Sequence, residues 1–143
     1  GEMGIPQVIL PGSVDMVNFG ARGTVPVQFE GRRFVSHTPL STLMRTTADE
    51  NAAMAGIVAR KLNQARGPVA VVLPGRGFSA YDAAGAAFHD PDADAAFSDA
   101  LTSALRPDIE VRRIDAHIND PACADLASRM LLDLLSNSRM SLS

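Results

Sequence analysis

The chain has 143 residues, of which 46% are hydrophobic and 20% are charged, and its formal net charge at pH 7 is −3. This composition is typical of one folded domain and excludes the basic character of a nucleic-acid-binding protein. The single cysteine, Cys123, excludes an internal disulfide and a cysteine-rich metal site. No apolar stretch approaches the roughly 18 residues of a membrane span, so we expect a cytoplasmic protein without membrane contacts.

Strand-like and helix-like segments alternate along the chain, which favours an α/β fold. The clearest strand is the unbroken apolar run from Val69 to Leu73, because runs without alternation are typical of parallel strands buried on both faces. The predicted elements, in chain order, are a strand at 7–10, an irregular segment at 13–39 with a short strand near 34–35, a helix at 48–66, a strand at 69–73, a helix at 91–105, an edge strand at 109–114 and a helix at 121–136.

Three helix starts carry capping signals. Thr47 and Glu50 fit a capping box, in which the threonine side chain accepts from the Glu50 amide and the glutamate reaches back to Thr47. Asp90 and Asp120 each stand before a proline, which is the pattern of an N-cap followed by a first-turn proline. These signals predict where the three helices begin.

The order of the elements predicts where a binding site would lie. Because right-handed crossovers make all the strands run the same way, the loops at 11–20, 74–90 and 115–120 should gather along one edge of the sheet. The predicted fold is a three-layer, Rossmann-like parallel sheet flanked by helices. We assign residues 1–136 to a single α/β domain and 137–143 to a flexible tail.

The first of these loops offers a carboxylate and a carboxamide, Asp15 and Asn18, three residues apart among apolar neighbours. If the stretch coils as a helical turn, the two side chains share a face and could hold a ribose, a metal or a partner loop. The alternative is a self-capped turn in which Asp15 binds nearby amides.

The second loop carries Arg76 between two glycines, a sequence that resembles a turn cradling a phosphate. Ser79 stands in a near match to the nucleophile elbow Gly-x-Ser-x-Gly, but Tyr81 replaces the last glycine. We therefore predict that Ser79, together with Asp82, hydrogen bonds a ligand or the loop itself rather than acting as a nucleophile.

The third loop places Asp115, His117, Asn119 and Asp120 within six residues of a strand end. His117 could act as a general base oriented by a carboxylate, or as a metal ligand beside Asp115. Asn119 is a further candidate ligand-binding side chain, whereas Asp120 is better explained as the cap of the last helix.

Metal chemistry receives little support from the sequence. The three histidines and the single cysteine lack zinc-binding spacing, so we predict no metal site of that kind. A weak Mg²⁺ site made by Asp15, Asp82 and Asp115 stays open as an alternative.

Arg45 and Thr46 stand immediately before the capped helix. A guanidinium, a hydroxyl and the free amides of a helix N-terminus together attract anions, so both residues are candidates for ligand binding. The alternative is that Thr47 only caps the helix and Arg45 pairs with a surface carboxylate.

Several long motifs resemble one protein family. They are Gly4–Val8, Pro11–Gly20 with its DMVNFG segment, Leu43–Thr47, Phe88–Asp94 and His117–Pro121. Over about residues 4 to 135 they look like the C-terminal half of the uncharacterised family typified by the tomato mosaic virus resistance protein, often described as an ATP-binding domain. The resemblance implies a Rossmann-like fold, an N-terminal α/β half as a partner and a dimer, with the nucleotide associated chiefly with that N-terminal half.

Our leading hypothesis is a ligand-binding module for a nucleotide, such as ATP, or another small anion, at the carboxyl edge of the parallel sheet. The first alternative is a hydrolase or transferase in which His117 is the base and Asp115, or another loop carboxylate, orients it or holds Mg²⁺. The second alternative is a protein-interaction domain without a small ligand, as the plant member of the family suggests.

Overall fold

The computed structural model describes residues 1–140. Its strands are β1 (Gln7–Ile9), β2 (Met16–Phe19), β3 (Phe34–Thr38), β4 (Ser41–Arg45), β5 (Val69–Pro74) and β6 (Glu110–Ile114). Its helices are α1 (Ala48–Asn63), α2 (Pro91–Ala104) and α3 (Pro121–Met140), with short 3-10 turns at Arg22–Thr24, Val27–Phe29 and Ala80–Asp82. No helix among these residues has the length and apolar character needed to cross a membrane.

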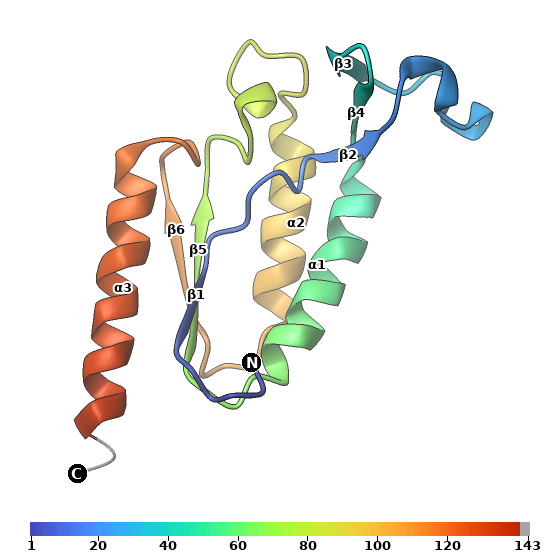
Figure 1. Cartoon of the computed structure of the whole chain (residues 1–143). Helices are drawn as coiled ribbons and strands as arrows, with labels where there is room; N and C mark the ends of the chain where they lie inside the picture. The colour runs from blue at the N-terminus through green and yellow to red at the C-terminus, as the bar shows by residue number, and fades with distance from the viewer. Residues whose placement is uncertain (141–143) are drawn as a thin grey trace.

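The main body is a three-layer α/β arrangement built on a parallel sheet with the strand order β1-β5-β6. Figure 1 shows α1 and α2 on one face of this sheet and α3 on the other. β5 is the central strand, and all six of its residues are buried. The predicted Rossmann-like α/β fold is therefore confirmed, as is the prediction that Val69–Leu73 forms a strand covered on both faces.

Two hydrophobic cores form on the two faces of β5, because successive side chains of a strand point to opposite sides. Val69, Val71 and Leu73 pack in the core made with α1 and α2. Ala70 and Val72 pack in the smaller core made with α3. β6 lies at an edge of the sheet, as its alternating sequence predicts.

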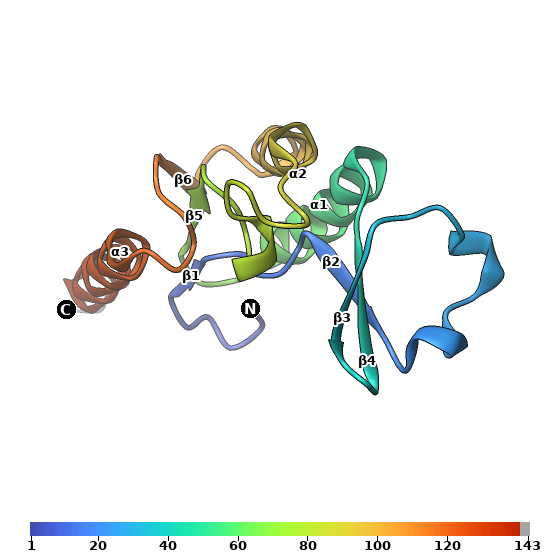
Figure 2. The same cartoon turned by 90° about the horizontal axis from the view of Figure 1, so that it is seen from above.

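A second, antiparallel sheet has the order β2-β4-β3 and projects from the main body (Figure 2). The sequence predicted only the strand near 34–35. The helical turn considered for Asp15–Asn18 as one of two alternatives is wrong, because Asn18 belongs to β2 and pairs with Leu43. The glycines and polar residues around β2 are typical of a turn. Its partner strand, β4, is distant in the sequence, so no local pattern indicates the pairing.

The capping signals predict all three helix starts correctly, and at two of them the capping side chain makes the expected hydrogen bond. Thr47 Oγ1 accepts a hydrogen bond from the Glu50 amide at 3.2 Å, and Glu50 Oε2 accepts one from the Thr47 amide at 2.8 Å. At the start of α2, Asp90 Oδ1 accepts from the Ala93 amide at 3.1 Å. Local sequence therefore determines how α1 and α2 begin.

The last helix begins at Pro121, as predicted, but its capping contact and its end differ from the prediction. The Asp120 carboxylate accepts from the His117 amide at 2.8 Å, so it stabilises the loop before α3 rather than the first helical turn. α3 extends to Met140, beyond the predicted helix end at 136 and into the segment predicted as a tail. No proline or glycine interrupts the sequence there, and the rest of the predicted tail, 141–143, lies outside the described residues.

Gly67, in the turn between α1 and β5, lets the N-terminal segment pass close by. A β-carbon on residue 67 would lie 2.3 Å from the Gly4 carbonyl oxygen and 3.0 Å from that of Ile5. We predict that Gly67→Ala lowers the free energy of unfolding by about 2 kcal/mol or more, because the backbone must shift to relieve the overlap. Urea denaturation measures the loss. Gly23→Ala is the control, since its β-carbon meets no atom within 4 Å, and an equal loss in both variants would contradict the argument.

Candidate functional site

The loops that follow β1, β5 and β6 meet at one edge of the parallel sheet, as the crossover rule predicts (Figure 1). The Ser13 amide donates to the Phe78 carbonyl at 2.8 Å, which joins the first loop to the second. The Ile118 amide donates to the Gly77 carbonyl at 3.2 Å, which joins the second loop to the third. Three segments far apart in the sequence therefore share one edge.

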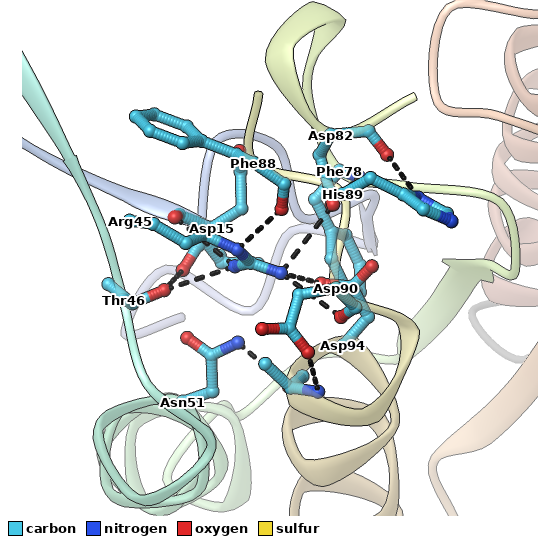
Figure 3. A network of polar contacts seen from close by, with 12 residues as sticks. Asp15, Arg45, Thr46, Asn51, Phe78, Asp82, Phe88, His89, Asp90 and Asp94 are labelled. Carbon is cyan, nitrogen blue, oxygen red and sulfur yellow. Dashed lines mark hydrogen bonds and ion pairs between the residues drawn. The ribbon is translucent and has the colours of Figure 1, made fainter. Parts of the chain in front are cut away.

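Arg45 is the centre of a polar network beside these loops (Figure 3). It comes from the end of β4 and is only 2% exposed. The five N–H groups of its guanidinium lie within hydrogen-bond distance of six acceptors and so bridge four segments of the chain. The acceptors are the main-chain oxygens of Asp15, Phe88 and Asp90, the hydroxyl of Thr46, and carboxylate oxygens of Asp82 and Asp94. The surface ion pair considered for Arg45 is therefore wrong.

Thr46 belongs to the same network, which accounts for its burial. Its hydroxyl donates to the Val14 carbonyl at 3.1 Å, and its amide donates to the Asp15 carbonyl at 3.0 Å. Both bonds hold the loop after β1 against the end of β4. Thr46 and Arg45 thus position this loop together.

Three carboxyl groups surround the single guanidinium. Asp15 and Asp82 are fully buried, and the side chain of Asp94 is 14% exposed. Burial raises the pKa of Asp15, and it raises the pKa of Asp94 to about 7. Asp94 also hydrogen bonds Asp82, whose negative charge further favours the protonated form. Asp94 therefore keeps its proton beside Arg45 up to about neutral pH.

A pocket of about 340 Å³ opens between the second sheet and the loop after β5, and we call it the loop-edge pocket. Ser79 lines this pocket, and its hydroxyl donates to Asp15 Oδ2 at 2.6 Å. Asp15 Oδ1 is buried and has no hydrogen-bond partner among the described residues. The Ser79 hydroxyl thus lies in the wall of the pocket, and the Asp15 carboxylate is buried behind it.

The opposite wall of the loop-edge pocket is also polar. Ser41 Oγ donates to Asn18 Oδ1 at 2.9 Å, and His37 Nδ1 lies 2.7 Å from the Tyr81 hydroxyl. The structure therefore brings together two predicted site residues, Asn18 and Ser79. Sequence reasoning missed His37, because its neighbour Tyr81 is 44 residues away and no local motif connects them.

Arg76 and Asp115 form an exposed ion pair outside this pocket. Two hydrogen bonds of 2.7 Å join the guanidinium to the carboxylate, and the pair holds the pKa of Asp115 below its usual range. Gly77 adopts a φ of +117°, and a β-carbon there would lie 2.3 Å from the Asp82 carbonyl oxygen. A glycine is therefore required at position 77 by the tight turn itself.

His117 is held by main-chain groups of the loops. Its Nε2 lies 2.8 Å from the Ser79 carbonyl, and its Nδ1 accepts from the Asn119 amide at 3.2 Å. This pattern assigns the ring hydrogen to Nε2 of a neutral imidazole. Neither ring nitrogen contacts Asp115, and Asn119 takes part through its main chain.

The residues considered for metal binding lie apart. Within residues 1–140, no group of three or more His, Cys, Asp or Glu side chains could hold a metal ion. Asp15 and Asp82 belong to the buried network, whereas Asp115 belongs to the exposed pair with Arg76. Cys123 is buried, as predicted, and burial raises the pKa of its thiol.

Asp94 is the network residue that sequence reasoning missed. It lies in the Phe88–Asp94 motif, which contributed to the family resemblance and, at Asp90, to the helix cap. An acidic residue in the first turn of a helix is common, so Asp94 carried no signal of its own. Its 2.6 Å contact with Arg45 is apparent only in the folded structure, where the end of β4 lies beside the first turn of α2.

A parallel sheet covered on both faces, with a polar pocket beside its carboxyl edge, defines this protein as a Rossmann-like α/β domain. Residues 1–135 match the C-terminal domain of an uncharacterised protein family, UPF0261. The chain belongs to this family, which confirms the resemblance drawn from its motifs.

Several curated relatives match nearly all of this chain. A UPF0261 protein of Rhizobium meliloti is 45% identical over 132 residues, which are 91% of this chain and 33% of the relative. One of Clostridium tetani is 37% identical over 135 residues, or 94% of this chain and 33% of the relative. The ToMV resistance protein Tm-1 of Solanum lycopersicum is 39% identical over 140 residues, or 96% of this chain and 19% of the relative. The chain thus spans about a third of the length of these bacterial relatives.

Arg45→Met tests how much the buried network contributes to stability. The substitution leaves Asp82, Asp94 and several carbonyls without their donor, so we predict a loss of about 3 to 5 kcal/mol in the free energy of unfolding. Urea denaturation measures the loss. Arg112→Met removes an exposed pair with Glu110 and should lose less than about 1 kcal/mol. If Arg45→Met lost no more than this control, the network would not be a major stabilising feature.

The raised pKa of Asp94 makes stability depend on pH. The folded protein keeps this proton up to about pH 7, whereas the unfolded chain releases it near 3.8. The resulting stabilisation is complete below about pH 4 and is lost as pH rises through about 7. We predict that the unfolding free energy of the unsubstituted protein falls with pH relative to Asp94→Asn, by at most about 1.4 kcal/mol per pH unit. Urea denaturation at several pH values measures this, and a difference that stays constant would contradict it.

Proposed function

We propose that this domain binds a small hydroxyl-bearing molecule, such as the ribose part of a nucleotide, in the loop-edge pocket. The observation that carries the proposal is the buried Asp15 carboxylate behind the Ser79 hydroxyl in the pocket wall. Ser79 gives its proton to Asp15, and its oxygen accepts from the Tyr81 amide at 3.2 Å, so one lone pair of that oxygen remains to accept a hydrogen bond from a ligand hydroxyl.

The other walls support a neutral ligand group. Asn18, His37 and Tyr81 supply hydrogen-bonding groups, and Met16 and Leu43 supply apolar surface. Such a mixture is typical of small-molecule pockets. Arg45 and Arg76, the cations that the sequence suggested for an anion, are bound to protein carboxylates instead. The pocket therefore favours hydroxyl recognition over charge recognition.

The longer family members extend this proposal. Because this chain spans about a third of its bacterial relatives, we propose that an N-terminal half of the family unit supplies further walls and the phosphate contacts of a nucleotide such as ATP. The predicted homo-oligomer belongs to the same proposal. An isolated domain would then bind its ligand more weakly than the whole protein.

The enzymatic alternative has less support from the geometry. A general base oriented by a carboxylate needs a hydrogen bond between the two groups. Both nitrogens of His117 are instead engaged by main-chain groups, and Asp115 is engaged by Arg76.

One observation favours a protein-interaction role as the second candidate. The second sheet and its connecting arm project from the main body and expose Val17, Val27 and Leu40. Val27 and Leu40 are 83% and 79% exposed. Exposed apolar side chains on a projecting element are a feature of interaction surfaces.

A thermal-shift titration with adenosine, D-ribose 5-phosphate and ATP, with and without Mg²⁺, tests the proposed function. Ligand at about 100 times its Kd adds about 2.7 kcal/mol to the unfolding free energy. We predict a rise in Tm of several degrees for at least one probe. Asn18→Ala should weaken that binding about tenfold, because it removes one hydrogen-bonding side chain from the wall.

Gln64→Ala is the matched control, because Gln64 is exposed and follows the far end of α1. It should bind the probe as the unsubstituted protein does. No shift with any probe, or an equal loss in both variants, would reject the loop-edge pocket as the binding site.

A further inference from the structure

A second pocket, which we call the α2–β6 pocket, lies between α2 and the carboxyl ends of β5 and β6, and its volume is about 150 Å³. The polar side chains in its wall are those of Asp94, Ser98 and Arg113. The other residues of the wall are glycine or apolar. None of the residues of the α2–β6 pocket lines the loop-edge pocket, so the two pockets can be tested separately.

Asp94 connects the α2–β6 pocket to the buried network around Arg45 (Figure 3). Its Oδ1 accepts from Arg45 at 2.6 Å, and its side chain is 14% exposed. The other two carboxyl groups of the network, those of Asp15 and Asp82, are fully buried. Three carboxyl groups face one guanidinium there, and the proton held by Asp94 balances part of the negative charge. A positive ligand group in the α2–β6 pocket would replace that proton beside Asp94.

The other charges near Asp94 are held by partners or lie elsewhere. Two ion pairs lie on α2 and the segments packed against it: Asp90 with Arg33, and Asp99 with Arg113. His89 contacts the Asp82 carbonyl, and Asp92 lines a different pocket. Within the described part of the chain, Arg45 is therefore the cation that Asp94 contacts.

The other two polar side chains of the α2–β6 pocket have hydrogen-bonding groups to spare. Ser98 stands one turn after Asp94 on the same face of α2 and is 7% exposed, and its hydroxyl makes no hydrogen bond within residues 1–140. A buried hydroxyl of this kind requires a partner. Arg113 contacts Asp99 and Thr102 through Nη2 alone, so its Nε and Nη1 hydrogens remain for a ligand.

The pocket therefore carries opposite charges at two places along α2. Arg113 is held beside Asp99 and Thr102, and about 7 Å of helix axis separates Asp94 from Asp99. Ser98 lies between these positions on the helix. A cavity of about 150 Å³ holds a molecule the size of benzene, which leaves room for a short zwitterion.

We propose that the α2–β6 pocket binds a small α-amino acid such as glycine or alanine. The ammonium group pairs with the Asp94 carboxylate, and the ligand carboxylate accepts from Arg113 and from the Ser98 hydroxyl. Asp94 releases its proton to water as the ammonium group takes its place. The ligand carries one charge of each sign, so it matches both ends of the pocket.

Isothermal titration calorimetry with glycine, L-alanine, glycolate and ethanolamine, at constant ionic strength, tests this inference. Glycolate lacks the ammonium group and ethanolamine lacks the carboxylate. We expect glycine or L-alanine to bind at least about tenfold more tightly than either of these, because each analogue leaves one charged side chain of the pocket without its partner. Binding of an analogue as tightly as the amino acids, or no binding of either amino acid, would overturn the proposal.

The pH dependence of binding provides a second readout. The pKa of Asp94 is raised to about 7, and binding requires its ionised form, so the affinity for the amino acid should rise about tenfold between about pH 6 and about pH 8. Titrations in buffers of different ionisation enthalpy measure the proton released. Asp94→Asn should bind at least about tenfold more weakly and lose this rise. An affinity of the unsubstituted protein that does not change with pH would contradict the assigned role of Asp94.

Arg113→Gln tests the other end of the pocket and should weaken binding at least about fivefold. Arg112→Gln is the matched control, because Arg112 is the preceding residue of β6, points to the opposite face of the sheet and is absent from the pocket wall. It should bind as the unsubstituted protein does. Equal weakening in both variants would overturn the proposal.

Nuclear magnetic resonance locates the bound amino acid. Binding should shift the amide resonances of Ala95 and Ser98, which lie in the pocket wall. Shifts confined to other regions would also overturn the proposal. These outcomes are independent of the loop-edge pocket, because Asn18→Ala should leave amino-acid binding unchanged.

Discussion

The burial of Arg45 is the interaction on which the rest of the site depends. Its guanidinium comes from the second sheet and binds the loop after β1, the loop after β5 and the start of α2. A charged group taken out of water needs hydrogen-bond partners for its donors, so these segments must lie where the guanidinium reaches them. The projecting sheet is thereby fastened to the parallel sheet, and the loop-edge pocket forms at their junction.

The same interaction determines the charges inside the site. One guanidinium faces three carboxyl groups, so full ionisation would leave excess negative charge in a poorly hydrated region. The proton held by Asp94 relieves part of that excess. Replacement of buried ion pairs by apolar residues is often neutral for stability, so we infer that this network matters chiefly because it fixes the loops.

The loop-edge pocket contacts this network through Ser79, whose hydroxyl donates to Asp15. The second oxygen of Asp15 is buried and has no partner among the described residues. A hydroxyl-bearing ligand in this pocket would therefore be linked to the buried network through Ser79.

The sequence by itself determined the local features of this protein. The apolar run of β5, the capping box at Thr47 and the N-cap at Asp90 each depend on residues close together in the chain, and the crossover rule then predicted that the loops meet. Only the tertiary structure decided the partners of Arg45, the strand pairing of Asn18 and the contacts of His117. These contacts join segments that are far apart in the chain. The packing of the two sheets brings the segments together, and no periodicity or spacing in the sequence indicates it.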